Sequence, residues 1–184
     1  SHPQGTAISE IKKEDAEGVI VKPHEADFRP TTVIPNEIQT QVIRTPRGKE
    51  YQVILNDGTE VLLNAESKLI FPNKFSGSRR VVKLEGEAYF KVARNEQMPF
   101  IVETEKTSTR ALGTEFNIKA YKNAESHVTL INGSVLVNIP GTDQEVTLTP
   151  GQEATANEET LKVKEVDTNY YVQWKEGYFY FDNV

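Results

Sequence analysis

The feature that most constrains this chain is a repeated unit in which two alternating apolar stretches flank a glycine. The units centre on Gly58, Gly86, Gly113, Gly133 and Gly151, which follow one another at intervals of 28, 27, 20 and 18 residues. Alternation places one kind of side chain on each face of a strand, and glycine permits the positive φ of tight turns. The unequal intervals indicate a recurring structural device rather than a strict sequence repeat.

Composition favours the same kind of secondary structure. Val, Ile and Thr together number 47 of the 184 residues, whereas Leu, Ala and Met together number 22. β-Branched side chains suit pleated strands and lose rotamer freedom in helices. We therefore predict an all-β fold of about ten short strands built from glycine-turn hairpins, as a two-sheet sandwich or roll or a short β-solenoid, with little helix.

The turn residues predict particular hairpins. Asp57-Gly58 and Asn132-Gly133 suit a two-residue type I′ turn, in which both central residues have positive φ. Across the second of these turns Leu130 would lie opposite Val135, with both side chains on one face. Two further alternating sets are predicted to point into the same core, namely Ala88, Phe90 and Val92, and Phe116, Ile118 and Ala120.

The chain divides into three parts. Residues 1–40 are polar and rich in proline, which predicts a lead-in of short edge strands and loops. Residues 41–166 contain the glycine-centred units and form the predicted β domain. Residues 167–184 are predicted to be a linker, with a helical turn near Thr168–Val172 capped by Asp167, and then a strand that opens a truncated C-terminal α/β domain.

Several classes of protein are excluded. The chain has no cysteine, which removes disulfides, zinc fingers, iron–sulfur sites and thiol chemistry. Its longest apolar run, Tyr178–Phe181, is far shorter than the roughly 20 residues of a membrane-spanning helix. A net charge of -6 without a Lys/Arg cluster argues against nucleic acid, whose binding depends on neutralising phosphates.

Candidate chemical groups are few and dispersed. His2, His24 and His127 are isolated from one another, so no metal site is predicted. Glu85 and Glu87 flank Gly86 and could form the carboxylate pair of a glycosidase, although a solvated strand end is the preferred interpretation. Arg79-Arg80 is interpreted as two solvated charges in a loop. No catalytic residue and no cofactor is predicted.

One aromatic cluster stands out near the end of the chain. Trp174 precedes Tyr178, Phe179, Tyr180 and Phe181 within eight residues. These residues suit a strand whose apolar face belongs to a second folded unit. They also suit an exposed strand edge that accepts a partner strand, so Tyr178 to Phe181 are the predicted partner-binding residues.

A set of short motifs occurs in a fixed order and carries a family resemblance. The chain resembles the FecR family of sigma-factor regulators, in the form found in Bacteroidetes, over about residues 41–166. The motifs are Thr45-Pro46-Arg47-Gly48, Leu55-Asn56-Asp57-Gly58-Thr59, Leu63-Asn64-Ala65-Glu66-Ser67, Leu84-Glu85-Gly86-Glu87-Ala88-Tyr89-Phe90, Leu112-Gly113-Thr114-Glu115-Phe116-Asn117, Asn132-Gly133-Ser134-Val135 and Pro150-Gly151-Gln152.

The resemblance implies a periplasmic piece of a single-pass inner-membrane anti-sigma factor. Such a module would sense a TonB-dependent outer-membrane transporter through the transporter's N-terminal signalling domain. An extracytoplasmic-function sigma factor would be bound only by a cytoplasmic segment, and the membrane only by a transmembrane helix, both outside these residues. The motifs themselves are glycine turns and strands, which we interpret as fold-forming.

Two other functions remain open at this stage. The aromatics and the Glu85/Glu87 pair are compatible with a carbohydrate-binding or hydrolytic β-sandwich. Alternatively, the β domain is a spacer that positions a C-terminal domain, in which case its length matters and its surface residues do not.

Overall fold

The computed structural model describes residues 8–10, 20–22, 25–27 and 37–181, with side chains described from 37 to 177. These residues form sixteen strands and one helix, α1 (Asn169–Phe181). The strands are β1 (Ile8–Glu10), β2 (Ile20–Lys22), β3 (Glu25–Asp27), β4 (Thr40–Arg44), β5 (Tyr51–Ile54), β6 (Glu60–Leu63), β7 (Lys68–Pro72), β8 (Arg80–Lys91), β9 (Phe100–Glu103), β10 (Ser108–Ala111), β11 (Glu115–Ala120), β12 (Ser126–Asn132), β13 (Val135–Asn138), β14 (Glu145–Leu148), β15 (Gln152–Ala156) and β16 (Leu161–Glu165).

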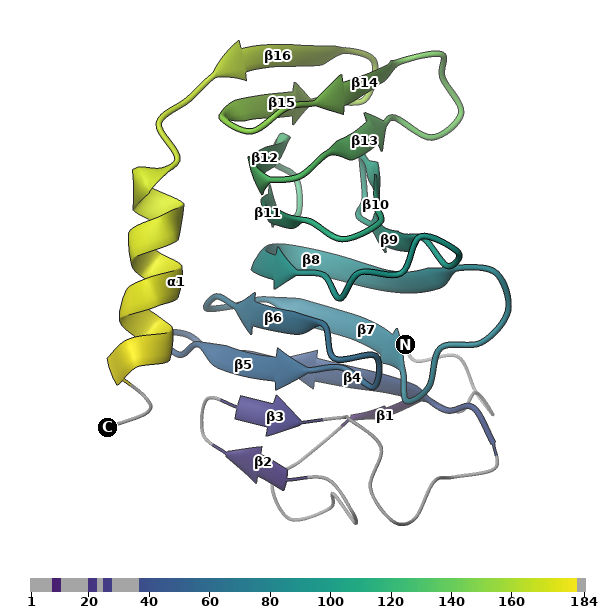
Figure 1. The fold of residues 1–184 in the computed structure, drawn as a ribbon, viewed down its shortest axis with the longest axis vertical. Helices are drawn as coiled ribbons and strands as arrows, with labels where there is room; N and C mark the ends of the chain where they lie inside the picture. Colours follow the sequence, from purple (N-terminus) through teal and green to yellow (C-terminus); the bar gives the residue numbers. More distant parts are fainter. Residues whose placement is uncertain (1–7, 11–19, 23–24, 28–36, 182–184) are drawn as a thin grey trace.

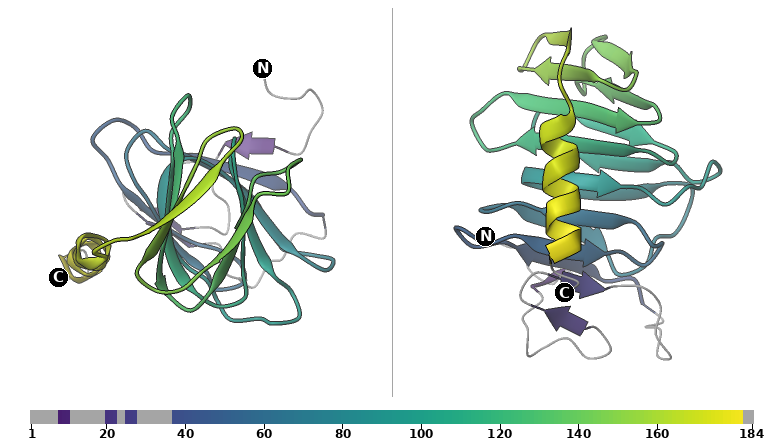
Figure 2. Two further views of the ribbon diagram at one scale, coloured as in Figure 1. Left: turned by 90° about the horizontal axis from the view of Figure 1, so that it is seen from above. Right: turned by 60° about the vertical axis from the view of Figure 1, so that its left-hand side comes forward.

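The strands form two layers that share β8. Sheet A has the order β14-β13-β10-β9-β8-β7-β4-β1, and sheet B has the order β16-β15-β12-β11-β8-β6-β5-β3-β2. In both layers the strands are stacked like rungs along the long axis of the molecule (Figure 1). Seen from above, the two layers enclose the core in a nearly closed, barrel-like arrangement (Figure 2). The prediction of an all-β fold is confirmed.

The chain builds this stack by alternating between the sheets. The β9–β10 and β13–β14 hairpins belong to sheet A, and the β11–β12 and β15–β16 hairpins belong to sheet B. The links between successive hairpins contain Gly113, Gly133 and Gly151, so these three glycines lie where the chain crosses from one layer to the other. Gly86 lies where β8 itself changes from pairing in sheet A to pairing in sheet B.

The predicted Asn132-Gly133 hairpin is therefore wrong. Leu130 pairs with Phe116 in sheet B, whereas Val135 pairs with Leu148 and Ala111 in sheet A. Both side chains still enter the core, because alternation fixes which face of a strand is apolar but not which strand lies beside it. The partner strand is chosen by distant contacts that a local pattern does not contain.

The predicted Asp57-Gly58 hairpin exists, but its turn is of a different type. Leu55 and Thr59 close a three-residue loop through a 2.9 Å hydrogen bond from the Leu55 N–H to the Thr59 carbonyl. Gly58 has φ of 89°, whereas Asp57 is not among the residues with positive φ. A type I′ turn would need positive φ at both, and a single left-handed glycine is typical of the three-residue loop.

One continuous core lies between the sheets. The predicted sets at residues 88, 90 and 92 and at 116, 118 and 120 are all part of it. Its aromatic centre is Phe90, which stacks on Phe116 with ring centroids 5.1 Å apart and contacts Phe100 at 6.2 Å. Burial of this apolar surface is the main favourable contribution to folding.

The C-terminal segment differs from its prediction. The cap is confirmed, since the Asp167 Oδ1 accepts a 2.9 Å hydrogen bond from the Asn169 N–H. The strand predicted to follow is wrong, because residues 169–181 form α1. The physical reason is the spacing of Tyr171, Trp174 and Lys175, which puts all three on one side of a helix and leaves Gln173 and Glu176 exposed.

Helix α1 lies outside the β domain, along the outer surface of sheet B, and runs across the strands (Figures 1 and 2). In the part of the chain that the structure describes, no helix combines the length and hydrophobicity that a membrane crossing requires. Much of the predicted lead-in at residues 1–40 lies outside the described ranges.

The close packing at Gly86 yields a stability prediction. A Cβ at this position would lie 2.2 Å from Ser67 Oγ and 2.7 Å from Ser67 Cα, and the residue has φ of 106°. Gly86→Ala should therefore lower the free energy of unfolding by about 3 kcal/mol in urea denaturation, through backbone strain plus overlap. The matched control is Gly141→Ala, where φ is 79° but nothing lies within 4 Å. An equal loss in both variants would show that the close approach at Gly86 is unimportant.

Candidate functional site

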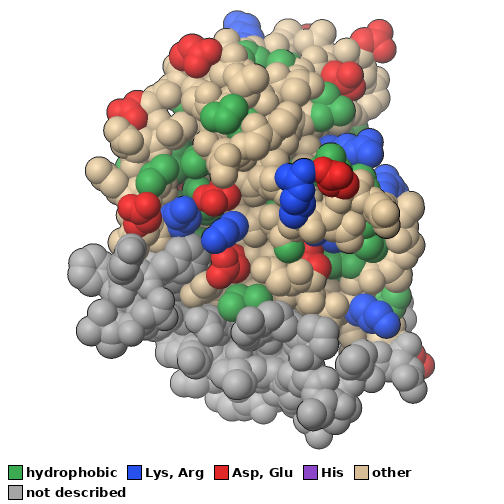
Figure 3. Space-filling model, viewed as in Figure 1, with side chains coloured by type: hydrophobic (Ala, Val, Ile, Leu, Met, Phe, Trp, Pro, Cys, Tyr) green, Lys and Arg blue, Asp and Glu red, His purple; other side chains and the backbone are tan. Residues whose placement is uncertain are grey.

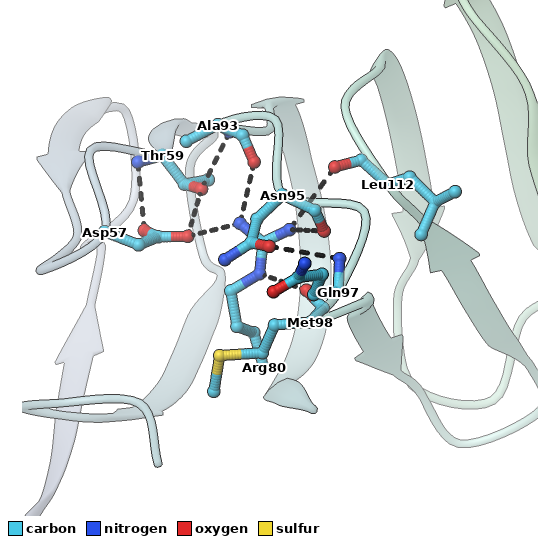
Figure 4. Close-up of polar contacts among 8 residues, drawn as sticks. All are labelled: Asp57, Thr59, Arg80, Ala93, Asn95, Gln97, Met98 and Leu112. Carbon is cyan, nitrogen blue, oxygen red and sulfur yellow. Dashed lines mark hydrogen bonds and ion pairs between the residues drawn. The ribbon is translucent and has the colours of Figure 1, made fainter. Parts of the chain in front are cut away.

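Arg80 is the most buried charged side chain described, with 1% of its surface exposed. Its Nε donates to the Met98 carbonyl at 2.7 Å, and its Nη1 donates to Asp57 Oδ2 and to the Ala93 carbonyl, each at 2.7 Å (Figure 4). Nη2 donates to the Leu112 carbonyl at 3.3 Å. The guanidinium therefore binds the loop after β8, the β5–β6 turn and the β10–β11 crossing at once.

Asp57 is itself held in place for this ion pair. Its carboxylate accepts hydrogen bonds from the Thr59 N–H at 3.0 Å and from the Thr59 hydroxyl at 2.8 Å. The Thr59 hydroxyl oxygen in turn accepts from the Ala93 N–H at 3.1 Å. Every strong donor and acceptor around the buried charge is thus satisfied, which is the condition for keeping an ion pair away from water.

The interpretation of Arg80 as a solvated loop charge is wrong, whereas its neighbour Arg79 is exposed as expected. The sequence did contain a signal. Arg80 has the same parity as Val82 and Leu84 along β8, and residues two apart on a strand share a face. Arg80 must therefore point to the side that those core residues occupy.

Glu85 and Glu87 do not form a catalytic pair. Glu85 lies in the sheet A half of β8 and forms an ion pair with Lys68 at 3.4 Å. Glu87 is buried, and its two oxygens accept hydrogen bonds from the side-chain amides of Asn64 at 2.9 Å and Asn117 at 3.0 Å. The interpretation of Glu87 as part of a solvated strand end is also wrong. A buried carboxylate with both oxygens bound by amides does not suit the acid or nucleophile of a glycosidase.

Of the three histidines, the structure describes only His127. His127 lies on the outer face of sheet B, where its Nδ1 is 3.1 Å from the Thr155 hydroxyl and 3.3 Å from Glu153. His2 and His24 lie outside the described residues. Among the residues that are described, no group of three or more His, Asp or Glu side chains is placed to hold a metal ion.

The most unusual surface is a buried row on the outer face of sheet B. In register from strand to strand it contains Leu62, Tyr89, Asn117, Thr129 and Glu153, each less than 10% exposed. The outer face of a sheet normally meets water, so burial of this row requires a cover. That cover is α1, and we call the row together with Glu115 the α1 seat.

Contacts between α1 and the seat centre on Tyr89 and Glu115. The Tyr89 hydroxyl donates to Glu115 Oε2 at 2.6 Å, and Lys175 Nζ donates to the same oxygen at 3.1 Å. Trp174 packs edge-on against the Tyr89 ring, with centroids 6.5 Å apart, and the Lys175 ammonium lies 5.7 Å from the centre of that ring. Sequence reasoning missed this site, although the spacing of Tyr171, Trp174 and Lys175 could have indicated it.

The environment of the seat changes the ionisation of these groups. Burial, followed by the hydrogen bond to Glu115, raises the pKa of the Tyr89 hydroxyl. Burial alone would raise the pKa of Glu115, but the hydrogen bonds from Tyr89 and Lys175 outweigh it, so that the pKa lies below its ordinary value. At neutral pH the seat therefore presents an ionised carboxylate to the helix.

The predicted partner-binding residues, Tyr178 to Phe181, lie in the last turn of α1 and not on a strand edge. Their side chains lie outside the described part of the structure, so their role remains a prediction. On the face seen in Figure 3, acidic and basic side chains are interspersed and hydrophobic ones are scattered over the described region.

Comparison with known proteins identifies relatives of this chain. The family model described as FecR protein matches residues 41–136, from β4 to the start of β13. Two crystal structures of proteins assigned as anti-sigma factors from Parabacteroides distasonis, at 1.65 and 2.50 Å resolution, superpose with a TM-score of 0.69 at 34% identity. The alignments cover 75% and 74% of this chain, and this chain spans about 65% of the length of each match. No curated protein gives a significant match.

A second stability prediction concerns the hydrogen bonds from Arg80 to Asp57 and to the Met98, Ala93 and Leu112 carbonyls, which we call the clamp. Arg80→Met removes the guanidinium while keeping much of the apolar stem. It takes the arginine donors away from the Met98, Ala93 and Leu112 carbonyls and leaves the Asp57 carboxylate without its buried counter-charge. We expect a loss of about 3–5 kcal/mol in the free energy of unfolding. Arg79→Met is the matched control, because Arg79 is exposed, and it should change stability by less than about 0.5 kcal/mol. Similar losses in the two variants would contradict the clamp.

Proposed function

Because this chain belongs to the FecR family, we propose that it is the periplasmic signalling module of a transmembrane anti-sigma factor. In this role it relays the state of a TonB-dependent outer-membrane transporter to an extracytoplasmic-function sigma factor. The observation that supports the proposal most strongly is the match of the family model across β4 to β13, together with 34% identity to proteins assigned as anti-sigma factors.

The placement of the family motifs is compatible with a scaffold. From one motif, Asp57 accepts a hydrogen bond from Arg80 and Thr59 accepts one from the Ala93 N–H. From another motif, the Leu112 carbonyl accepts a hydrogen bond from Arg80. Asn64, from a third motif, and Asn117, from the same motif as Leu112, bind Glu87. The motif residues therefore hold the strand links in position, and recognition of partners is left to other surfaces.

Helix α1 is the candidate output element. It follows the last strand of sheet B and lies across several strands of that sheet, so a change at the β domain can alter its position. In the proposed protein a cytoplasmic segment binds the sigma factor, and the periplasmic part binds the N-terminal signalling domain of the transporter. The β domain belongs to this periplasmic part.

The direct test is binding between the complete periplasmic region and the signalling domain of the cognate transporter, measured by isothermal titration calorimetry. We expect a saturable interaction with the cognate signalling domain and none with the same domain from an unrelated transporter. No binding to either, together with unchanged target-gene expression when the gene for this protein is deleted, would contradict the proposal.

The spacer alternative is tested in the same system. If the β domain only sets a distance, charge substitutions on the outer faces of sheets A and B would leave target-gene expression unchanged, whereas deletion of one β-hairpin would not. Under the signalling proposal we expect target-gene expression to change with substitutions around α1 and not only with deletion of a hairpin.

A further inference from the structure

Helix α1 is attached to the protein differently from the strands. The hydrophobic core cluster is drawn from residues 43–154, and no described residue of α1 belongs to it. Tyr171, Trp174 and Lys175 face the sheet but are only partly buried. The seat beneath them combines Leu62 and the Tyr89 ring with polar side chains. Because no described residue of α1 belongs to the core cluster, departure of the helix would leave the core between the sheets closed.

One carboxylate oxygen joins the helix to the sheet. Glu115 Oε2 accepts from Tyr89, which belongs to β8, and from Lys175, which belongs to α1. The Tyr89–Glu115 bond lies within sheet B and does not need the helix. The Lys175 ammonium is the group that crosses, and it meets both the Glu115 oxygen and the face of the Tyr89 ring.

Polar groups in the seat also favour a reversible contact. Asn117 is 1% exposed, yet its Oδ1 has no hydrogen-bond partner. Tyr171 lies against Thr129. Burial raises the pKa of the Tyr171 hydroxyl, and the carboxylates of Glu153 and Glu87 raise it further. A buried acceptor without a donor weakens the docked state, because that atom would regain a hydrogen bond to water when the helix leaves.

We propose that α1 is a reversible latch, held closed on sheet B by the contact between Lys175 and Glu115 and able to leave while the β domain stays folded. An element of this kind opens with a free energy below that of global unfolding. The inference concerns contacts within this chain and does not depend on which partner the protein has.

The charges around Glu115 define how acid acts on the latch. Lys175 faces it from α1, Lys91 faces it from β8, and Glu176 of α1 acts on the neighbouring Tyr89. The pKa of Glu115 is lowered from its ordinary value of 4.5 in the docked protein. The Tyr89 bond persists when α1 leaves, so docking is linked to pH through the Lys175 contact, whose contribution is present while Glu115 is ionised and is lost as the pH falls through the lowered pKa. Acid should therefore open the latch.

Trp174 is the only tryptophan in the chain, so its fluorescence reports the position of α1. The experiment measures acrylamide quenching of Trp174 in the 184-residue chain, with N-acetyltryptophanamide as the exposed standard. For Glu115→Gln we expect the docking constant to fall about fivefold at neutral pH, equivalent to about 1 kcal/mol. Quenching should rise toward the standard, while circular dichroism still shows folded strands. Wild-type protein should show the same rise on acidification, and Glu115→Gln a smaller one.

Two further variants make the test decisive. Lys175→Met removes the same contact from the helix side and should match Glu115→Gln. Glu85→Gln removes a carboxylate from a half-exposed ion pair with Lys68 on sheet A and should leave quenching at the wild-type level. The proposal is overturned if neither Glu115→Gln nor Lys175→Met changes the quenching. It is equally overturned if both unfold the strands, or if Trp174 in the wild type is already as accessible as the standard.

Discussion

The buried ion pair of Arg80 and Asp57 is the interaction on which the rest of this structure depends. Removing two charges from water costs several kcal/mol for each ion, and only complete hydrogen bonding offsets that cost. Here the guanidinium reaches a carboxylate and the carbonyls of Met98, Ala93 and Leu112. Those acceptors lie on three separate links between strands, so the ion pair fixes the links relative to one another.

The glycines complement this clamp. At Gly113 a Cβ would lie 2.8 Å from Arg94 Cβ, and at Gly133 it would lie 2.6 Å from Thr114 Cγ2. The crossing segments thus pack against the loop after β8 and against each other more closely than a side chain would allow. A charged clamp and close backbone packing together explain how strands that, apart from β8, are only three to seven residues long form one stack.

How much of this could be foreseen from the sequence differs between elements. Alternation placed Phe90, Phe116 and Leu130 in the core, because the period of a strand is local. Strand pairing was not foreseeable at Asn132-Gly133, because a tight turn can end a hairpin or begin a crossing, and the choice depends on distant strands. A strand was predicted in place of part of helix α1 because four consecutive aromatics are typical of strands. The helical spacing of Tyr171, Trp174 and Lys175, which precede them, indicates the helix. The FecR resemblance, which rested on ordered motifs, is confirmed.

The proposed function and the proposed latch both involve α1. Signalling requires an element whose position changes, and the latch proposal makes α1 such an element. Hydrogen–deuterium exchange of the complete periplasmic region, with and without the transporter's signalling domain, tests this directly. We predict that binding changes the exchange of residues 169–181 while the amides around Arg80 keep their protection. Unchanged exchange in α1 on saturation with the bound domain would contradict it.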